Sequence, residues 1–266
     1  MQVVQAILLG IIQGISEFLP ISSSGHLRVA QELFGIVDEF GLAFDTMVHV
    51  ATLLAVVVYF RDDIVHMARA FLSTDPALAK DRRLAWLVVI ATIPTGIIGL
   101  AGSGFFESAD MLYVGIAFLF TSAALTTAEL LSRRSLHAAE GLGWKRALLV
   151  GIAQGIAIMP GVSRAGATMA MGLGVGLDRE QAARFSFLLS GPIILLAGAS
   201  QAVEVFSGQT ALPGLAASVA GFIAAAVTGY AAIAGLMAYL KRHSFAVFAV
   251  YTALMGVSVL VWRLTG

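Results

Sequence analysis

Two stretches decide how this chain folds: GIIQGISEFLPISSSGH at residues 10–26 and GIAQGIAIMPGVSRAGAT at residues 151–168. Each contains Gly-x-x-Gln-Gly-Ile and then passes a proline, Pro20 or Pro160, into a turn rich in Ser and Gly. The first turn holds an acid, serines and a histidine, whereas the second holds an arginine. Both turns are too polar for the apolar segments around them, which indicates an internal repeat whose halves contribute different chemistry.

The composition is that of a membrane protein. Of the 266 residues, 59% are hydrophobic and 12% are charged, and the mean hydropathy is +0.91, whereas soluble domains carry about 25% charged residues. The apolar runs are continuous rather than alternating, which favours helical spans over a β-barrel. The absence of cysteine excludes disulfides and thiolate metal sites. The first residues lack a basic segment, so we expect no cleavable signal peptide.

The apolar stretches predict the fold class. A membrane span needs about 20 apolar residues, and six stretches qualify. These are 41–60, 84–101, 111–131, 185–205, 213–240 and 245–263. Shorter apolar arms flank the polar turns, at 2–15 and 27–37 in the first half and at 147–159 and 169–177 in the second. We therefore expect an all-α polytopic membrane protein with about six transmembrane helices and two re-entrant helix hairpins, forming one domain over residues 1–266.

The basic residues predict the orientation of the spans. Lys and Arg gather in 61–83, 132–146, 179–184 and 241–242, whereas the connections 102–110 and 206–212 have none. Because cytoplasmic loops are enriched in Lys and Arg, the basic segments face the cytoplasm and both termini face outside.

This count makes the two halves inverted repeats. A hairpin and three spans begin outside in repeat 1, about 1–131, and the same set begins inside in repeat 2, about 147–263. Inverted repeats with interrupted helices place a binding site near the middle of the membrane, at the repeat interface. We therefore expect the two polar turns to meet there.

The second turn has the features of an anion site. Arg164 is always charged, and its guanidinium can bind two phosphate oxygens at once. Ser163 and the backbone of Gly161 and Gly166, at the start of a helical arm, could add N–H donors, as helix N-termini do. Arg164 could also simply pair with Glu17 to hold the two hairpins together, and the two roles are compatible.

The first turn has the features of a reacting site, with Glu17, Ser22, Ser23, Ser24 and His26 within ten residues. A serine hydroxyl becomes a nucleophile when a base takes its proton, and a compact turn could bring Ser23 and His26 to one phosphorus atom. Glu17 could orient His26, act as the base or hold a divalent cation. The alternatives are that the serines serve as turn residues and that His26 is a satisfied buried imidazole.

Asp45 and His49 stand one helical turn apart near the outer end of the first span, so they share a helix face. The pair could line the same cavity behind the reacting groups. It could equally be a structural hydrogen bond, and the sequence favours neither.

Residues 13–26 together with Pro160-Gly-Val-Ser-Arg-Ala-Gly-Ala-Thr168 resemble the two signature motifs of the undecaprenyl pyrophosphate phosphatases, the bacitracin-resistance family. The resemblance extends over the whole chain, including Phe185-Ser-Phe-Leu-Leu. It implies a multi-pass enzyme of the bacterial cytoplasmic (inner) membrane that removes the terminal phosphate of the C55 polyprenyl diphosphate. That reaction recycles the lipid carrier for peptidoglycan synthesis and confers bacitracin resistance, with the active site on the outer face.

The resemblance also assigns roles to residues. Glu17, Ser23 and His26 match the catalytic acid, serine and histidine. The residues expected to bind the diphosphate are Arg164, Ser163, Gly166, Thr168 and Ser22, with Gln13 and Ser24 behind them. Some members have Glu where this chain has Gln13, so Glu17 is the carboxylate left to hold a divalent cation, Mg²⁺ or Ca²⁺.

We expect hydrolysis of a phosphoanhydride in which Arg164 and a divalent cation neutralise the diphosphate, and His26 or Glu17 activates either Ser23 or a water. The rival reading is a polyprenyl-phosphate flippase or transporter, because inverted repeats with broken helices are typical of transporters. A phosphatase with a phosphohistidine intermediate is disfavoured, since the next histidine after Arg164 is His243. The expected partners are the lipid substrate and the bilayer, a homodimer could form, and we expect no nucleic acid.

Overall fold

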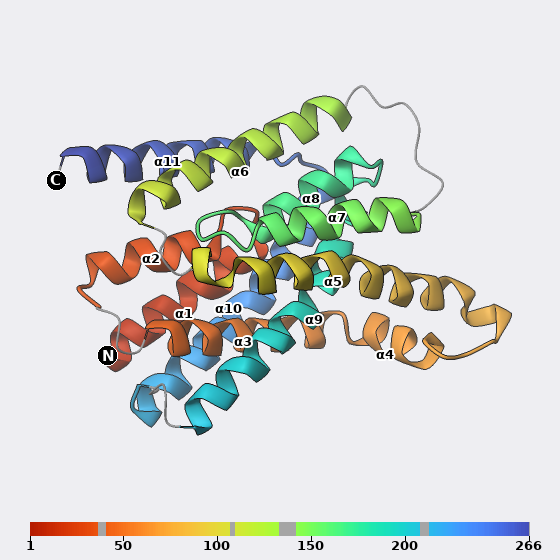
Figure 1. Cartoon of the computed structure of the whole chain (residues 1–266), viewed down its shortest axis with the longest axis horizontal. Coiled ribbons are helices and arrows are strands. Elements are labelled where there is room, and N and C mark those ends of the chain that lie inside the picture. Colours follow the sequence, from red (N-terminus) through yellow and green to blue (C-terminus); the bar gives the residue numbers. More distant parts are fainter. Residues whose placement is uncertain (37–40, 107–109, 133–141, 208–212, 266) are drawn as a thin grey trace.

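The computed structural model describes residues 1–36, 41–106, 110–132, 142–207 and 213–265, and this part of the chain contains helices and no strand (Figure 1). The helices of repeat 1 are α1 (Val3–Phe18), α2 (Ser23–Leu33), α3 (Gly41–Tyr59), α4 (Arg61–Ala70), the 3₁₀ turn η1 (Pro76–Leu78), α5 (Ala79–Phe106) and α6 (Met111–Ser132). Those of repeat 2 are α7 (Trp144–Ile156), α8 (Arg164–Gly174), α9 (Arg179–Phe206), α10 (Leu215–Leu240) and α11 (Ala246–Thr265).

The long helices agree with the predicted spans. In the described part of the chain, α5, α6, α9, α10 and α11 are long and apolar enough to cross a membrane. α3 and α4 together form a sixth candidate, which is bent by 80° between them. At 1.5 Å per residue, the 16 residues of α1 and the 13 of α7 are too short to cross about 30 Å of hydrocarbon. The prediction of an all-α polytopic membrane protein is therefore confirmed.

The outer faces of the long helices are apolar. Only 22% of the spanning window of α11 and 28% of that of α10 is buried inside the protein. The side chains that these helices expose include Ile223, Val227, Leu254 and Val261. A surface of this kind requires an apolar solvent, because large contiguous apolar patches are rare on soluble proteins. These faces therefore contact lipid.

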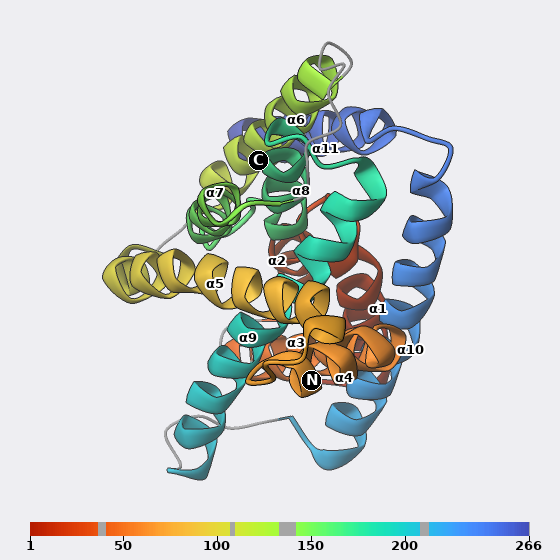
Figure 2. The ribbon, with the colours of Figure 1, turned by 90° about the vertical axis from the view of Figure 1, so that its right-hand side faces the viewer.

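The two short hairpins, α1–α2 and α7–α8, lie among the long helices (Figures 1 and 2). α1 packs along α10, and α7 packs along α5. Glycine makes both contacts close: a Cβ on Gly14 would lie 2.0 Å from Thr228 Oγ1, and one on Gly151 would lie 2.0 Å from Ala91 O. Small residues that let helix backbones approach are the usual basis of helix association in membranes. The glycines of the two polar stretches thus set how each hairpin is held.

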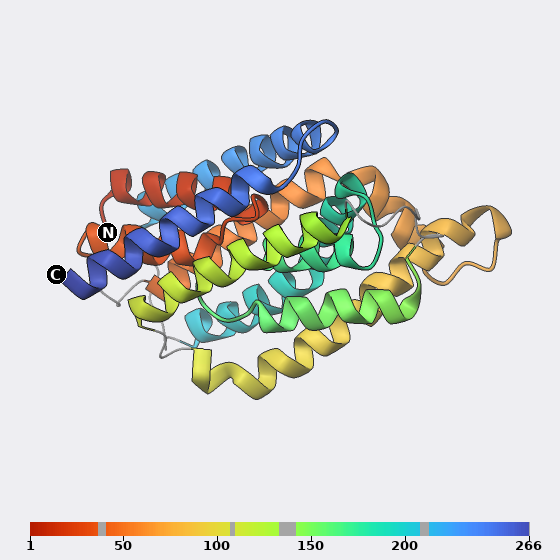
Figure 3. The same cartoon turned by 90° about the horizontal axis from the view of Figure 1, so that it is seen from above.

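In each half two short helices precede three long ones, and the first half has in addition the short helix α4 and the 3₁₀ turn η1. Both termini lie at one end of the bundle, whereas α4 and η1 lie at the other (Figures 1 and 3). This agrees with the expectation that the termini share one side and that the basic segment 61–83 is on the other. The inverted relation of the halves, the re-entrant path and the membrane orientation stay predictions.

One partly buried ion pair connects the two halves of the chain away from the polar turns. Arg179 on α9 donates through Nε and Nη2 to the two carboxylate oxygens of Glu129 on α6, at 2.8 and 2.7 Å. The backbone N–H of Phe245, just before α11, donates to the same carboxylate at 2.8 Å. Such bidentate, charge-assisted contacts fix geometry well, so this pair fastens α6, α9 and α11 together.

Candidate active site

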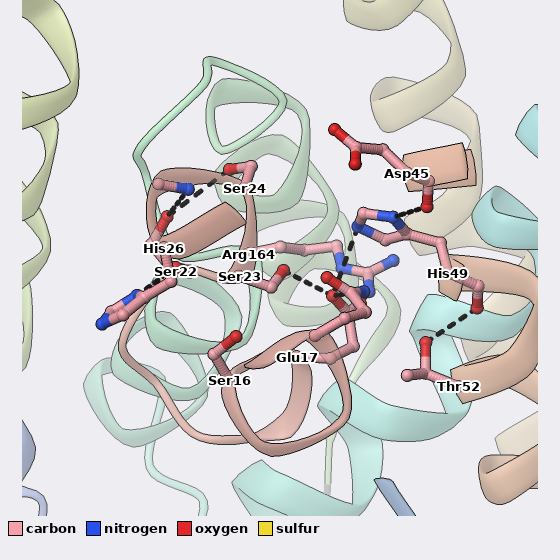
Figure 4. Close-up of polar contacts among 12 residues, drawn as sticks. Ser16, Glu17, Ser22, Ser23, Ser24, His26, Asp45, His49, Thr52 and Arg164 are labelled. Carbon is pink, nitrogen blue, oxygen red and sulfur yellow. Dashed lines mark hydrogen bonds and ion pairs between the residues drawn. The ribbon is translucent and has the colours of Figure 1, made fainter. Parts of the chain in front are cut away.

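The two polar turns meet, as the sequence predicts (Figure 4). Arg164 at the start of α8 forms an ion pair with Glu17 in the last turn of α1. A second contact joins the hairpins, because the backbone N–H of Gly161 donates to Ser24 Oγ at 3.2 Å. Segments more than 130 residues apart therefore form one polar cluster between apolar helices.

Glu17 is the centre of this cluster. Its side chain is 2% exposed, and Nη2 of Arg164 donates to Oε1. The other oxygen, Oε2, accepts hydrogen bonds from Ser23 Oγ at 2.6 Å and Gln13 Nε2 at 2.9 Å. A buried carboxylate is tolerated only when charge and hydrogen bonds satisfy it. These three donors do so, and they keep Ser23 oriented towards a base.

Local packing fixes the position of Glu17. The next residue, Phe18, is 1% exposed and packs edge-to-face on Phe187 of α9, with ring centroids 5.4 Å apart. α1 ends at Phe18, and the chain then turns through Pro20 to Ser22, the N-cap of α2. Ser22 has φ 74°, in the left-handed region that non-glycine residues rarely adopt. This tight turn brings the start of α2, with Ser23, back over the end of α1.

Arg164 begins α8, whose N-cap is Ser163. Ser163 Oγ accepts from Gly166 N at 2.9 Å, and Ser163 N donates to Thr121 Oγ1 on α6 at 3.0 Å. The N–H groups that we expected at the anion, those of Gly161, Ser163 and Gly166, are therefore already bonded. Within the described part of the chain, the N–H groups of Arg164 and Ala165 have no hydrogen-bond partner. They are the donors that the first turn of α8 offers to an anion.

Thr168 lies one turn further along α8 and supports Arg164 from behind. Its hydroxyl donates to the backbone O of Arg164 at 2.8 Å and lies 2.5 Å from Ser186 Oγ on α9. Thr168 is thus bonded to helix backbone and to α9, and its contacts do not reach Glu17. The expected role of Thr168 in binding diphosphate is indirect in this geometry.

His26 points away from Glu17, and its expected action together with Ser23 stays a prediction. Its Nδ1 lies 2.7 Å from Ser22 O and its Nε2 lies 2.7 Å from Tyr251 OH on α11. The ring also stacks on Tyr251 and lies edge-on to Phe118 of α6, with centroids 5.6 and 5.1 Å apart. In Figure 4 the His26 ring lies on the far side of Ser22 from Glu17 and Arg164.

His49 is the histidine that approaches the carboxylate. Its Nε2 lies 3.4 Å from Glu17 Oε2, and its Nδ1 lies 2.6 Å from the backbone O of Asp45. The Asp45 side chain accepts from Gln31 Nε2 of α2 at 2.7 Å. The sequence left open whether this pair lines the site or is a structural hydrogen bond. In the structure His49 lines the site, and its hydrogen bond goes to the backbone O of Asp45 and not to the Asp45 side chain.

The described residues do not form a site for a resident metal ion. No group of three His, Asp or Glu side chains in this part of the chain could hold one. Both oxygens of Glu17 are engaged, and the buried oxygen without a partner in the cluster is Gln13 Oε1. Mg²⁺ and Ca²⁺ take six or more oxygen ligands, so a cation would need most of its ligands from the substrate. The divalent cation stays a prediction.

Several residues that contact the cluster are not indicated by any sequence pattern. Tyr251, Thr121 and Ser186 lie on long helices and bond His26, Ser163 and Thr168 respectively. Each lies in a predominantly apolar span that also carries other Ser and Thr residues. A polar residue at membrane depth is a functional candidate in general, but its spacing does not indicate which turn it faces.

The comparisons with known proteins agree with the resemblance. The family model described as bacitracin resistance protein BacA matches residues 6–258. A protein of Rubrobacter xylanophilus named undecaprenyl-diphosphatase is 45% identical over 266 residues, covering 94% of each chain. Proteins of the same name from Methanosphaera stadtmanae and Myxococcus xanthus are each 40% identical, and they cover 98% and 100% of this chain and 98% and 91% of their own. Because both the family match and these relatives extend over nearly the whole chain, this protein belongs to the BacA family of bacitracin resistance proteins.

Proposed function

We propose that this protein is a phosphatase that hydrolyses undecaprenyl diphosphate to undecaprenyl phosphate and inorganic phosphate. The observation that carries the proposal is the cluster in which Arg164 pairs with Glu17 while Ser23 donates to the same carboxylate. This cluster brings together the Arg164 guanidinium, which can bind the diphosphate, the Ser23 hydroxyl and the Glu17 carboxylate, which can act as a base. Relatives that cover nearly the whole chain are named for this activity.

Binding begins with an exchange of partners at Arg164. Its guanidinium leaves Glu17 for the diphosphate, which offers more charge and more acceptor oxygens. The N–H groups of Arg164 and Ala165 at the start of α8 add donors from the helix terminus. In phosphoryl transfer, placement and charge neutralisation of this kind make the main contribution to rate.

The same exchange prepares the nucleophile. Once Arg164 leaves, Glu17 becomes a stronger base, because a neighbouring positive charge no longer stabilises its ionised form. Ser23 already donates to Glu17 Oε2 at 2.6 Å. Ser23 attacks the terminal phosphorus, its proton passes to Glu17, and the bond from that phosphorus to the bridging oxygen breaks. Lipid monophosphate leaves, and water then hydrolyses the phosphoserine. If water attacks directly instead, Glu17 takes the proton of that water.

The lipid tail has a matching cavity of about 400 Å³ between α3, α4, α5 and α9. Leu53, Val56 and Val57 of α3 line it, and they follow His49 at the spacing of one helix face. α3 therefore passes from polar residues at the cluster to apolar residues in the cavity, in the order of a diphosphate head and a prenyl tail. Its volume is in the range of ligand pockets, and it would hold part of the tail while lipid surrounds the rest.

We further propose that the site opens to the outer face of the bacterial inner membrane and that the activity confers bacitracin resistance. The positions of the basic segments support this orientation. The family is named for that resistance.

A phosphate-release assay on the purified protein in detergent tests the proposed function. We expect turnover of undecaprenyl diphosphate, and we expect a chelator to reduce it if a cation arrives with the substrate. A flippase would instead give no phosphate release in detergent and would move polyprenyl phosphate across sealed vesicles. Absence of phosphate release with and without Mg²⁺ or Ca²⁺ would overturn the proposal.

A further inference from the structure

The pair of Ser23 and Glu17 continues to a third group, His49. Ser23 Oγ donates to Glu17 Oε2 at 2.6 Å, and the same oxygen lies 3.4 Å from His49 Nε2. The three residues come from α2, α1 and α3, and Figure 4 shows them around one carboxylate. His26 is bonded instead to Ser22 O and Tyr251. The histidine beside the reacting carboxylate is therefore His49.

The hydrogen bond at the other ring nitrogen defines what His49 can do. Nδ1 lies 2.6 Å from the backbone O of Asp45, and a carbonyl oxygen only accepts. Nδ1 thus carries the hydrogen, and Nε2 of the neutral ring holds its lone pair towards Glu17. His49 Nε2 and Glu17 Oε2 are then both acceptors, so they form no hydrogen bond until a proton lies between them. With a proton there, the contact becomes a charge-assisted hydrogen bond.

We propose that His49 is a positioning residue of the reaction, which takes from Glu17 the proton that Ser23 loses. This inference rests on the proposed function. As the bond from Ser23 Oγ to phosphorus forms and the bond from phosphorus to the bridging oxygen breaks, the electron pair leaves with the lipid monophosphate. The proton of Ser23 passes to Glu17 Oε2 and then to His49 Nε2. It returns to Ser23 Oγ by the same route when water releases the phosphate.

The surrounding charges favour a proton on His49 once substrate is bound. The charged and titratable groups near His49 in the described chain are Glu17 on α1, Asp45 on α3 and Arg164 on α8, with Arg28 of α2 near Asp45. When Arg164 turns to the diphosphate, Glu17 loses its positive partner. An imidazolium at His49 then supplies one.

The test compares three histidines by phosphate release from farnesyl diphosphate in detergent, measured across pH. His49→Gln keeps a polar side chain but cannot hold the proton. We expect kcat to fall by about 10²-fold. KM should stay within about threefold of the wild-type value, because Arg164 and the N–H groups of α8 that bind the diphosphate are unchanged. The acidic limb of the pH profile should move to lower pH. His66→Gln, which changes an exposed histidine of α4, is the matched control and should leave all three unchanged.

His26→Gln separates this inference from the role that the resemblance assigns to His26. We expect that variant to keep the acidic limb at its wild-type position, whatever its effect on kcat. His49→Ala in the presence of added imidazole is the second measurement, because the His49 side chain is 28% exposed and free imidazole could replace it. We expect partial rescue.

The inference is overturned if His49→Gln keeps the wild-type rate and limb, if His26→Gln moves the limb instead, or if folded His49→Ala shows no rescue. Failure of the wild-type protein to release phosphate would refute the proposed function itself.

Discussion

Replacement of Arg164 by alanine separates the two roles of the Glu17–Arg164 pair, stability and catalysis. Arg164→Ala leaves a carboxylate that is 2% exposed without its cation, and removing one partner of a buried pair costs about 3–5 kcal/mol. Ser23 and Gln13 still donate to Glu17 at 2.6 and 2.9 Å, so we expect a loss of about 3 kcal/mol in unfolding free energy. For a chain of this size that lowers the melting temperature by about 6–12 °C.

The double variant Glu17→Gln/Arg164→Ala removes the buried charge together with its partner. We expect it to recover to within about 1 kcal/mol of the wild-type protein. Activity should behave differently: the single and double variants should each lose at least about 10³-fold in kcat, because the arginine stabilises charge in the transition state. Arg164→Lys should restore part of the stability and little of the rate, since an ammonium lacks the planar fork.

Thermal unfolding in detergent and phosphate release from undecaprenyl diphosphate measure the two effects on the same samples. The matched control is Arg184→Ala, which breaks the exposed pair of Arg184 with Asp63 and should cost less than about 1 kcal/mol with unchanged turnover. The reasoning is wrong if Arg164→Ala turns over within tenfold of the wild-type rate. It is also wrong if the double variant is no more stable than Arg164→Ala.

Three further predictions follow from other contacts. Ser23→Ala should abolish turnover if a phosphoserine is obligatory, and phosphate release that persists in this variant would mean that water attacks directly. Gly191→Leu fills the cavity that Gly191 lines, so it should raise the KM for undecaprenyl diphosphate and leave the KM for farnesyl diphosphate nearly unchanged. The control is Gly191→Ala, whose Cβ would lie 3.8 Å from Leu53. Equal effects of Gly191→Leu on both substrates would mean that the tail binds elsewhere. Gly151→Ala forces a Cβ to 2.0 Å from Ala91 O and should lower the unfolding free energy by about 1–3 kcal/mol. The control is Gly96→Ala in α5, whose Cβ would have no atom within 4 Å, and it should be neutral or stabilising in the same melting assay.

Much of this site is predictable from sequence because polar residues in apolar segments are few. Glu17 and Arg164 each stand in a polar turn between short apolar arms, and a buried charge at membrane depth needs a partner. Together with the inverted arrangement of the two halves, that requirement predicts that the turns meet, and the structure confirms it. The same reasoning could not predict Tyr251, Thr121 or Ser186, because nothing in an apolar span marks the face that one hydroxyl occupies.

The assignment of the histidines shows what sequence spacing leaves open. His26 is three residues from Ser23, which suggests a shared site, but contacts from distant helices turn its ring towards Tyr251 and Phe118. His49 is 32 residues from Glu17, and its approach depends on the rotation of α3. Val48 and Ala51 are fully buried in a cluster with Ala6 and Leu9 of α1, and that packing orients His49 towards the carboxylate.

The sequence by itself determined the class of protein, the positions of the long apolar helices and the pair of turns that meet, since each depends on composition, periodicity and the cost of charge in a membrane. Only the tertiary structure decided which histidine lies beside Glu17, which N–H groups of α8 remain for an anion and where a cavity lies along α3. These features depend on how far each helix is rotated about its axis. That rotation is set by side-chain packing between helices far apart in the chain, so no local pattern contains it.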